Sequence, residues 1–140
     1  MSLRSLPPLL RDDPVVASVL GQSSAVLAVP EPARAFVLAG LASLSNRHPY
    51  VVAVPTTTDA ERLALDLRAF LGGDRVEVFP AWETLPFERV SPSVETMGRR
   101  LRVMWRLRPD RAPGEGPGSP RVLVAPVRAG AKVENGKLVE

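Results

Sequence analysis

The chain has 140 residues, a length that fits one domain, and its 45% hydrophobic and 24% charged residues are ordinary for a globular protein. It contains no cysteine, which excludes disulfides and thiolate metal sites, and His48 is its single histidine. The net charge of +3 is too small to predict nucleic-acid binding by itself, although all but two of the eighteen basic residues are arginine.

Residues 1–25 are predicted to be a lead segment with one helix, roughly from Pro14 to Leu20. Asp12 and Asp13 stand just before this helix, and we interpret them as charges at a helix start rather than as an acid–base pair. No apolar run in this region is long enough for a signal peptide or a membrane span. We therefore expect a cytoplasmic protein with no membrane partner.

Residues 26–107 are predicted to form an α/β unit. Short, mainly apolar runs, typical of strands covered on both faces of a parallel sheet, lie at Val26–Val29, Val51–Val54, Val76–Phe79 and Val122–Ala125. Helical patterns alternate with these runs. The order predicts the α/β class, with an open parallel sheet of about four strands and flanking helices, as in P-loop NTPases and helicases.

Two of the helical patterns have a clear apolar face. The pattern over Thr58–Leu71 begins with a capping-box spacing of Thr58 and Glu61 and ends at Gly72. Its predicted inner face is Leu63, Ala64, Leu67, Phe70 and Leu71. The pattern over Ala33–Ser45 has its predicted inner face at Phe36, Val37, Gly40, Leu41 and Leu44.

The turn after the first predicted strand is where such a fold would bind phosphate. That chemistry needs glycines for backbone approach, a lysine, and a Ser or Thr hydroxyl for magnesium. Here Pro30 and Pro32 remove two N–H donors, and Glu31 brings a negative charge. Arg34 is the one candidate for a substitute cation. We interpret the loop as degenerate and expect no bound cofactor, no metal and no catalytic residue.

The segment Phe79–Pro92 is predicted to be a shaped loop used for packing or recognition. Trp82 and Phe87 are expected to anchor it by burying their rings. Glu83 and Arg89 form either a stabilising pair or contacts to a partner. Ser91 followed by Pro92 predicts the start of the next helix.

An arginine-rich helix follows, up to about residue 107. Its apolar face, expected to be buried, is Val94, Met97, Leu101, Met104 and Trp105. The opposite face carries Glu95, Arg99, Arg102 and Arg106. Two interpretations are open for this face: a solvated surface, or a basic stripe for nucleic acid or an acidic protein.

The C-terminal part is predicted to have little regular structure. Residues 108–121 form a loop rich in proline and glycine, and residues 122–129 hold the last strand. Residues 130–140 are interpreted as a poorly packed tail, non-native or truncated, with a small hairpin around Asn135-Gly136 as the alternative.

The block from Phe79 to Leu107 resembles the N-terminal segment of the bacterial transcription–repair coupling factor (Mfd). The residues that carry the resemblance are Trp82, Glu83, Thr84, Leu85, Pro86, Ser91, Pro92, Arg100 and Leu101. The chain is also similar to the first domain of the repair helicase UvrB, which keeps a working phosphate loop. The degenerate turn at Pro30–Arg34 favours the coupling factor.

The resemblance implies a non-catalytic scaffold subdomain. Coupling factors are ATP-driven DNA translocases that displace stalled RNA polymerase from lesions and recruit the excision-repair protein UvrA. The motor, with its ATP and magnesium, and most contacts to UvrA, RNA polymerase and DNA would lie in regions absent here, so the direct partners are the remaining domains. The alternatives are a UvrB-like helicase fragment that binds ATP through Arg34 and a nucleic-acid-binding module that uses Arg99, Arg102 and Arg106.

Overall fold

A three-stranded parallel sheet forms the centre of the computed structural model, which describes residues 2–83, 91–110, 114, 116–129, 132–134 and 137–139. The strands are β1 (Tyr50–Val54), β2 (Val76–Val78) and β3 (Val122–Pro126), in the order β1-β3-β2. Tyr50 and Val76 both align with Val122, on either side of β3. Three of the predicted strands are thus confirmed.

The fourth predicted strand, Val26–Val29, is absent, so the prediction of about four strands is wrong. The described residues of this segment belong to no strand, and the Val26 side chain is 98% exposed. An apolar run makes a strand only where a neighbouring backbone supplies ladder hydrogen bonds, and here none is supplied. The fold is α/β with an open parallel sheet, as predicted. The predicted likeness to a P-loop fold depended on this fourth strand and stays a prediction.

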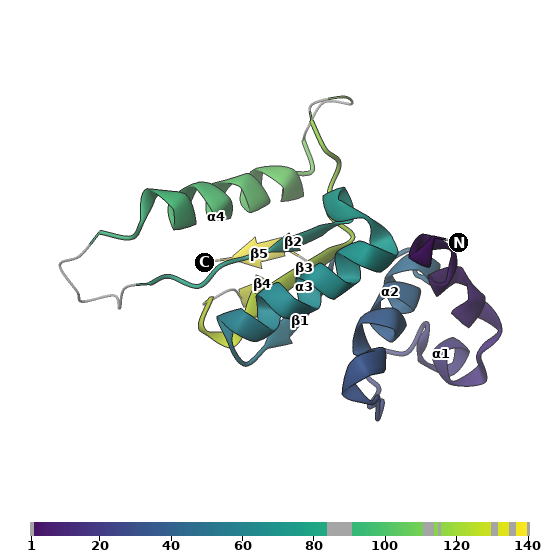
Figure 1. The fold of residues 1–140 in the computed structure, drawn as a ribbon. Helices are drawn as coiled ribbons and strands as arrows, with labels where there is room; N and C mark the ends of the chain where they lie inside the picture. Colours follow the sequence, from purple (N-terminus) through teal and green to yellow (C-terminus); the bar gives the residue numbers. More distant parts are fainter. Residues whose placement is uncertain are drawn as a thin grey trace.

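The described residues form four α-helices: α1 (Pro14–Val19), α2 (Arg34–Leu44), α3 (Thr57–Leu71) and α4 (Val94–Leu107). Short 3-10 turns lie at Leu3–Ser5, Pro7–Asp12, Glu31–Ala33, Gly73–Arg75 and Val127–Ala129. None of the described helices is long and apolar enough to cross a bilayer. Figure 1 shows the strands between α3 and α4.

The helix starts follow from local hydrogen bonds. The Asp13 carboxylate accepts the N–H groups of Val15 and Val16, so its predicted place at a helix start is confirmed. The cap of α3 is Thr56, paired with Asp59, two residues before the predicted Thr58 and Glu61. The same Ser/Thr-x-x-acid spacing occurs at both positions, and only Thr56 has the extended backbone of a cap.

The core has two parts, one on each face of the sheet. Val122 and Val124 of β3 pack with α2 and α3, whereas Leu123 and Ala125 pack with Phe79 and α4. The inner face predicted for α3 is largely confirmed, and Gly72 ends this helix with a φ of 98°. The buried positions of α2 are Ala35, Ala39, Gly40 and Ala42, so only Gly40 of its predicted face is fully buried. Its larger side chains, such as Leu38, are partly buried at the border of the core.

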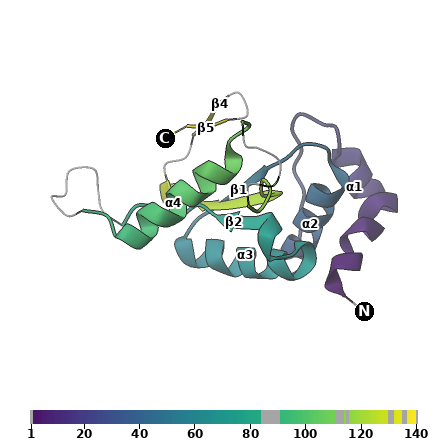
Figure 2. The same cartoon turned by 90° about the horizontal axis from the view of Figure 1, so that it is seen from above.

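The C-terminal residues form a separate two-stranded antiparallel sheet of β4 (Lys132–Glu134) and β5 (Lys137–Val139). The strand pairing agrees with the hairpin alternative, and the interpretation of residues 130–140 as a poorly packed tail, non-native or truncated, stays a prediction. Figure 2, seen from above, shows this small sheet apart from the central strands.

Candidate interaction surface

Glu83 fixes the start of α4. Its carboxylate accepts the Ser93 backbone N–H at 3.2 Å and the Thr96 hydroxyl at 2.8 Å, and the Ser93 hydroxyl lies 3.1 Å away. These hydrogen bonds lower the pKa of Glu83, with the Thr96 hydroxyl the largest cause. Ser93, and not the predicted Ser91, is the N-cap of the helix. The carboxylate thereby links the loop to α4.

Arg100 contacts the same N-terminal part of this loop, next to Glu83. Its side chain is buried, and its guanidinium lies 4.0 Å from the ring centroid of Phe79 and 4.3 Å from that of Trp82. Its Nη1 also donates to the Pro80 carbonyl at 2.7 Å and to the Ala129 carbonyl at 3.3 Å. The Trp82 ring therefore packs on a cation while remaining 39% exposed.

Arg100 is the residue whose role the sequence pattern did not reveal. In the helical pattern it stands among arginines and apolar residues, with nothing to mark it as buried. Its aromatic partners lie eighteen or more positions earlier, and only the packing of α4 on the sheet brings them together. Phe87 and Arg89, for which roles in this loop were also predicted, lie outside the described residues.

Each of the three aligned arginines of α4 pairs with a carboxylate of its own domain, but only Arg106 is buried. Arg106 is only 1% exposed and bonds the Glu77 carboxylate and the carbonyls of Asp74 and Gly118. Arg102 lies 3.2 Å from the Glu77 carboxylate, with 63% of its side chain exposed. Arg99 pairs with Glu61 of α3 at 2.7 Å. These arginines are thus engaged with carboxylates of their own domain.

The face of α4 predicted to be buried is instead exposed. Val94 is 83% and Leu101 60% exposed, and Met97, Met104 and Trp105 are each about 40% exposed. The residues that turn inward are Thr96, Arg100, Val103 and Arg106. The prediction was wrong because it assumed that apolar side chains must be buried. Buried arginines are acceptable here because β2, the loop and Gly118 supply aromatic rings, a carboxylate and carbonyls.

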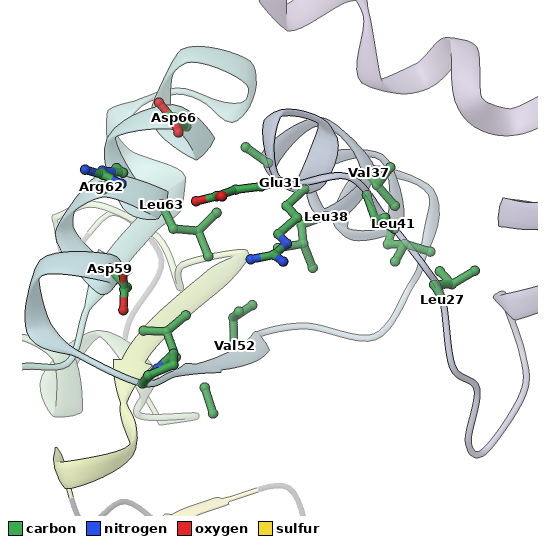
Figure 3. A pocket seen from close by; sticks show the side chains of 16 residues that line it. Leu27, Glu31, Val37, Leu38, Leu41, Val52, Asp59, Arg62, Leu63 and Asp66 are labelled. Carbon is green, nitrogen blue, oxygen red and sulfur yellow. The ribbon is translucent and has the colours of Figure 1, made fainter.

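The predicted phosphate turn forms the start of α2. Pro30 caps a 3-10 turn with no side-chain hydrogen bond, Pro32 lies inside that turn, and Arg34 begins the helix. Glu31 and Arg34 line a cavity of about 540 Å³ between α2, α3 and β1. Figure 3 shows Glu31 close to Leu38 and Leu63 around this cavity. Its lining is mostly apolar and includes charges of both signs.

No family model matches the chain. Over 87 residues it is 44% identical to the transcription-repair-coupling factors of Mycobacterium bovis and Mycobacterium tuberculosis, covering 61% of this chain and 7% of each relative. Over 65 residues it is 38% identical to the Haemophilus influenzae transcription-repair-coupling factor, covering 46% of this chain and 6% of that protein.

The resemblance to transcription-repair-coupling factors is confirmed. The similarity runs through more than half of the chain, far beyond the nine residues that first indicated it. The matched segment spans only 7% of the mycobacterial coupling factors. The activity of a whole coupling factor therefore does not transfer to these residues directly.

Proposed function

We propose that this chain is a non-catalytic scaffold subdomain of a transcription–repair coupling factor. The observation that carries the proposal is the 44% identity to the mycobacterial coupling factors over 87 residues. The whole protein would displace stalled RNA polymerase from DNA lesions and recruit the repair protein UvrA. ATP, magnesium and most partner contacts would belong to its other regions.

The absence of catalysis is supported by the chemistry of the turn before α2. A phosphate needs several backbone N–H groups pointing at it, and Pro30 and Pro32 have none. The Glu31 carboxylate lies where it would repel an anion. One arginine, Arg34, does not replace a lysine together with a magnesium-binding hydroxyl.

The scaffold role is supported by the outer face of α4 and the adjoining loop. Exposed Val94 and Leu101, together with Trp82, offer apolar surface of the kind enriched in protein interfaces. Arg99 and Arg102 lie beside it, engaged with Glu61 and Glu77, and Glu83 holds the loop. We propose that this surface meets the remaining domains of the coupling factor. Arg106 would contribute indirectly, by fixing α4.

The test is thermal unfolding of the purified chain with and without millimolar Mg-ATP. We expect a cooperative transition whose midpoint is the same in both conditions. Arg34→Ala serves as the matched variant and should give the same two curves. A midpoint raised by several degrees in ATP, and lost in Arg34→Ala, would instead identify an ATP-binding helicase fragment.

DNA binding is tested separately by fluorescence anisotropy with labelled duplex DNA at 50 and 200 mM salt. We expect no saturable binding, because Arg99, Arg102 and Arg106 already face carboxylates. Binding that weakens steeply with salt, and less steeply after replacement of the three arginines by glutamine, would favour the nucleic-acid-binding module.

A further inference from the structure

One edge of β1 has no partner strand among the described residues. β1 pairs with β3 only, and the backbone N–H of Tyr50 donates to the Arg121 carbonyl on that side. In a parallel ladder alternate residues point to the same neighbour. Tyr50, Val52 and Val54 therefore bond β3, whereas the N–H and C=O groups of Val51 and Ala53 point to the free edge.

The cavity beside α2 reaches this free edge. It is lined by Val52, Ala53 and Val54, three consecutive residues of β1. Because successive residues of a strand point to opposite faces, a cavity that contacts all three extends along the edge of the strand. On its far side the cavity is lined by Leu27 and Val29, from the extended segment before α2; Figure 3 shows Leu27 across from Val52.

The lining of the cavity indicates what it accepts. The helices contribute apolar side chains, Leu38 and Leu41 from α2 and Leu63 from α3. The charges, Arg34 and Arg62 against Glu31, Asp59 and Asp66, include both signs and select neither an anion nor a cation. An apolar wall beside free backbone donors and acceptors is suited to an extended peptide that adds a strand and inserts alternate apolar side chains.

We propose that this edge of β1 accepts a β-strand supplied by another part of the coupling-factor polypeptide. The inference rests on the proposed function. The matched segment makes up 7% of the mycobacterial proteins, so nearly all of a coupling factor lies outside it. The added strand would pair with Val51 and Ala53, place apolar side chains against Leu38 and Leu63, and cover an edge that is otherwise open to aggregation.

The experiment uses the 140-residue chain and overlapping 15-residue synthetic peptides that span the Mycobacterium tuberculosis coupling factor. Amide hydrogen exchange is followed residue by residue by NMR. In the chain alone, the Val51 and Ala53 amides should exchange at least about tenfold faster than the Val52 amide, which bonds β3. At least one peptide with alternating apolar residues should slow both by about tenfold or more.

Ala53→Pro removes one free-edge donor without touching a hydrogen bond to β3, and proline is tolerated on edge strands. It should weaken peptide binding about tenfold, whereas Ala53→Val, which keeps the donor, should bind like the original chain. Circular dichroism checks that Ala53→Pro is folded. If it is not, Leu27→Asp, which changes only the cavity wall, should weaken the same peptide.

Three results would overturn the proposal. The first is that no peptide slows the exchange of the Val51 and Ala53 amides. The second is that these two amides are already protected in the monomer, which would mean that residues 26–29 pair there. The third is that their protection rises with protein concentration, which would identify a second copy as the occupant. None of these results depends on ATP binding, so failure here is distinguishable from failure of the scaffold proposal.

Discussion

Truncation of Arg106 gives the sharpest test of how α4 is oriented. The side chain is 1% exposed, and its guanidinium bonds the Glu77 carboxylate and the carbonyls of Asp74 and Gly118. Arg106→Ala would leave two carbonyls without this donor. It would also leave the Glu77 carboxylate, 12% exposed, with only Arg102 at 3.2 Å. Breaking a buried ion pair in this way costs about 3–5 kcal/mol of unfolding free energy.

The matched control is Arg99→Ala, in the same helix. Arg99 and Glu61 form an ion pair in which both side chains are 43% exposed. Solvent screens such a pair, so its loss should cost about 0–1 kcal/mol. The two variants remove the same chemical group and differ mainly in burial. If the arginines shared a solvated face, both substitutions would be nearly neutral.

Urea unfolding followed by far-ultraviolet circular dichroism measures both costs. With a slope of about 2 kcal/mol per molar urea, Arg106→Ala should lower the midpoint by about 2 M and Arg99→Ala by less than about 0.5 M. If Arg106→Ala is too unstable to study, Arg106→Lys keeps the charge without the planar fork and should cost about 1–3 kcal/mol. Equal midpoints for Arg106→Ala and Arg99→Ala would refute the orientation of α4.

Two further predictions concern the ends and faces of α4. The pKa of Glu83 is lowered by hydrogen bonds from Thr96 and Ser93. The stabilising contribution of the Glu83 carboxylate is therefore present above the ordinary glutamate pKa and lost as pH falls through the lowered value. Glu83→Gln should therefore make the urea midpoint depend less on pH between pH 6 and pH 3. Leu101→Lys, at a 60% exposed position, should change the unfolding free energy by less than about 0.5 kcal/mol. Val103→Ala, at a 1% exposed position, should cost about 1–3 kcal/mol in the same urea assay, and the reverse order would contradict the structure.

The local elements of this chain could be predicted because their signals are local. Thr58–Leu71 carries a helical period with stop glycines, and the valine-rich runs that became β1, β2 and β3 lie between helical patterns. The fourth run, Val26–Val29, has the same appearance and forms no strand. Strand formation depends on a second backbone, whose place in space no short stretch of sequence contains.

The shortage of N–H donors in the predicted phosphate turn is a property of the sequence itself. Pro30 and Pro32 have no N–H in any fold, so the weakness of the phosphate turn needed no structure. The Trp82–Glu83 block likewise indicated the coupling-factor family before any contact was known, because a run of specific side chains is itself a local signal.

Only the tertiary structure decided which face of α4 is buried. The helical period fixes that Val94 and Leu101 share one face and that Arg102 and Arg106 lie on another, but it does not say which face meets the sheet. That choice depends on the surface opposite the helix, where Phe79, Trp82 and Glu77 provide the partners that make buried arginines favourable. These partners lie eighteen or more residues away along the chain, so the pattern of α4 alone cannot reveal them.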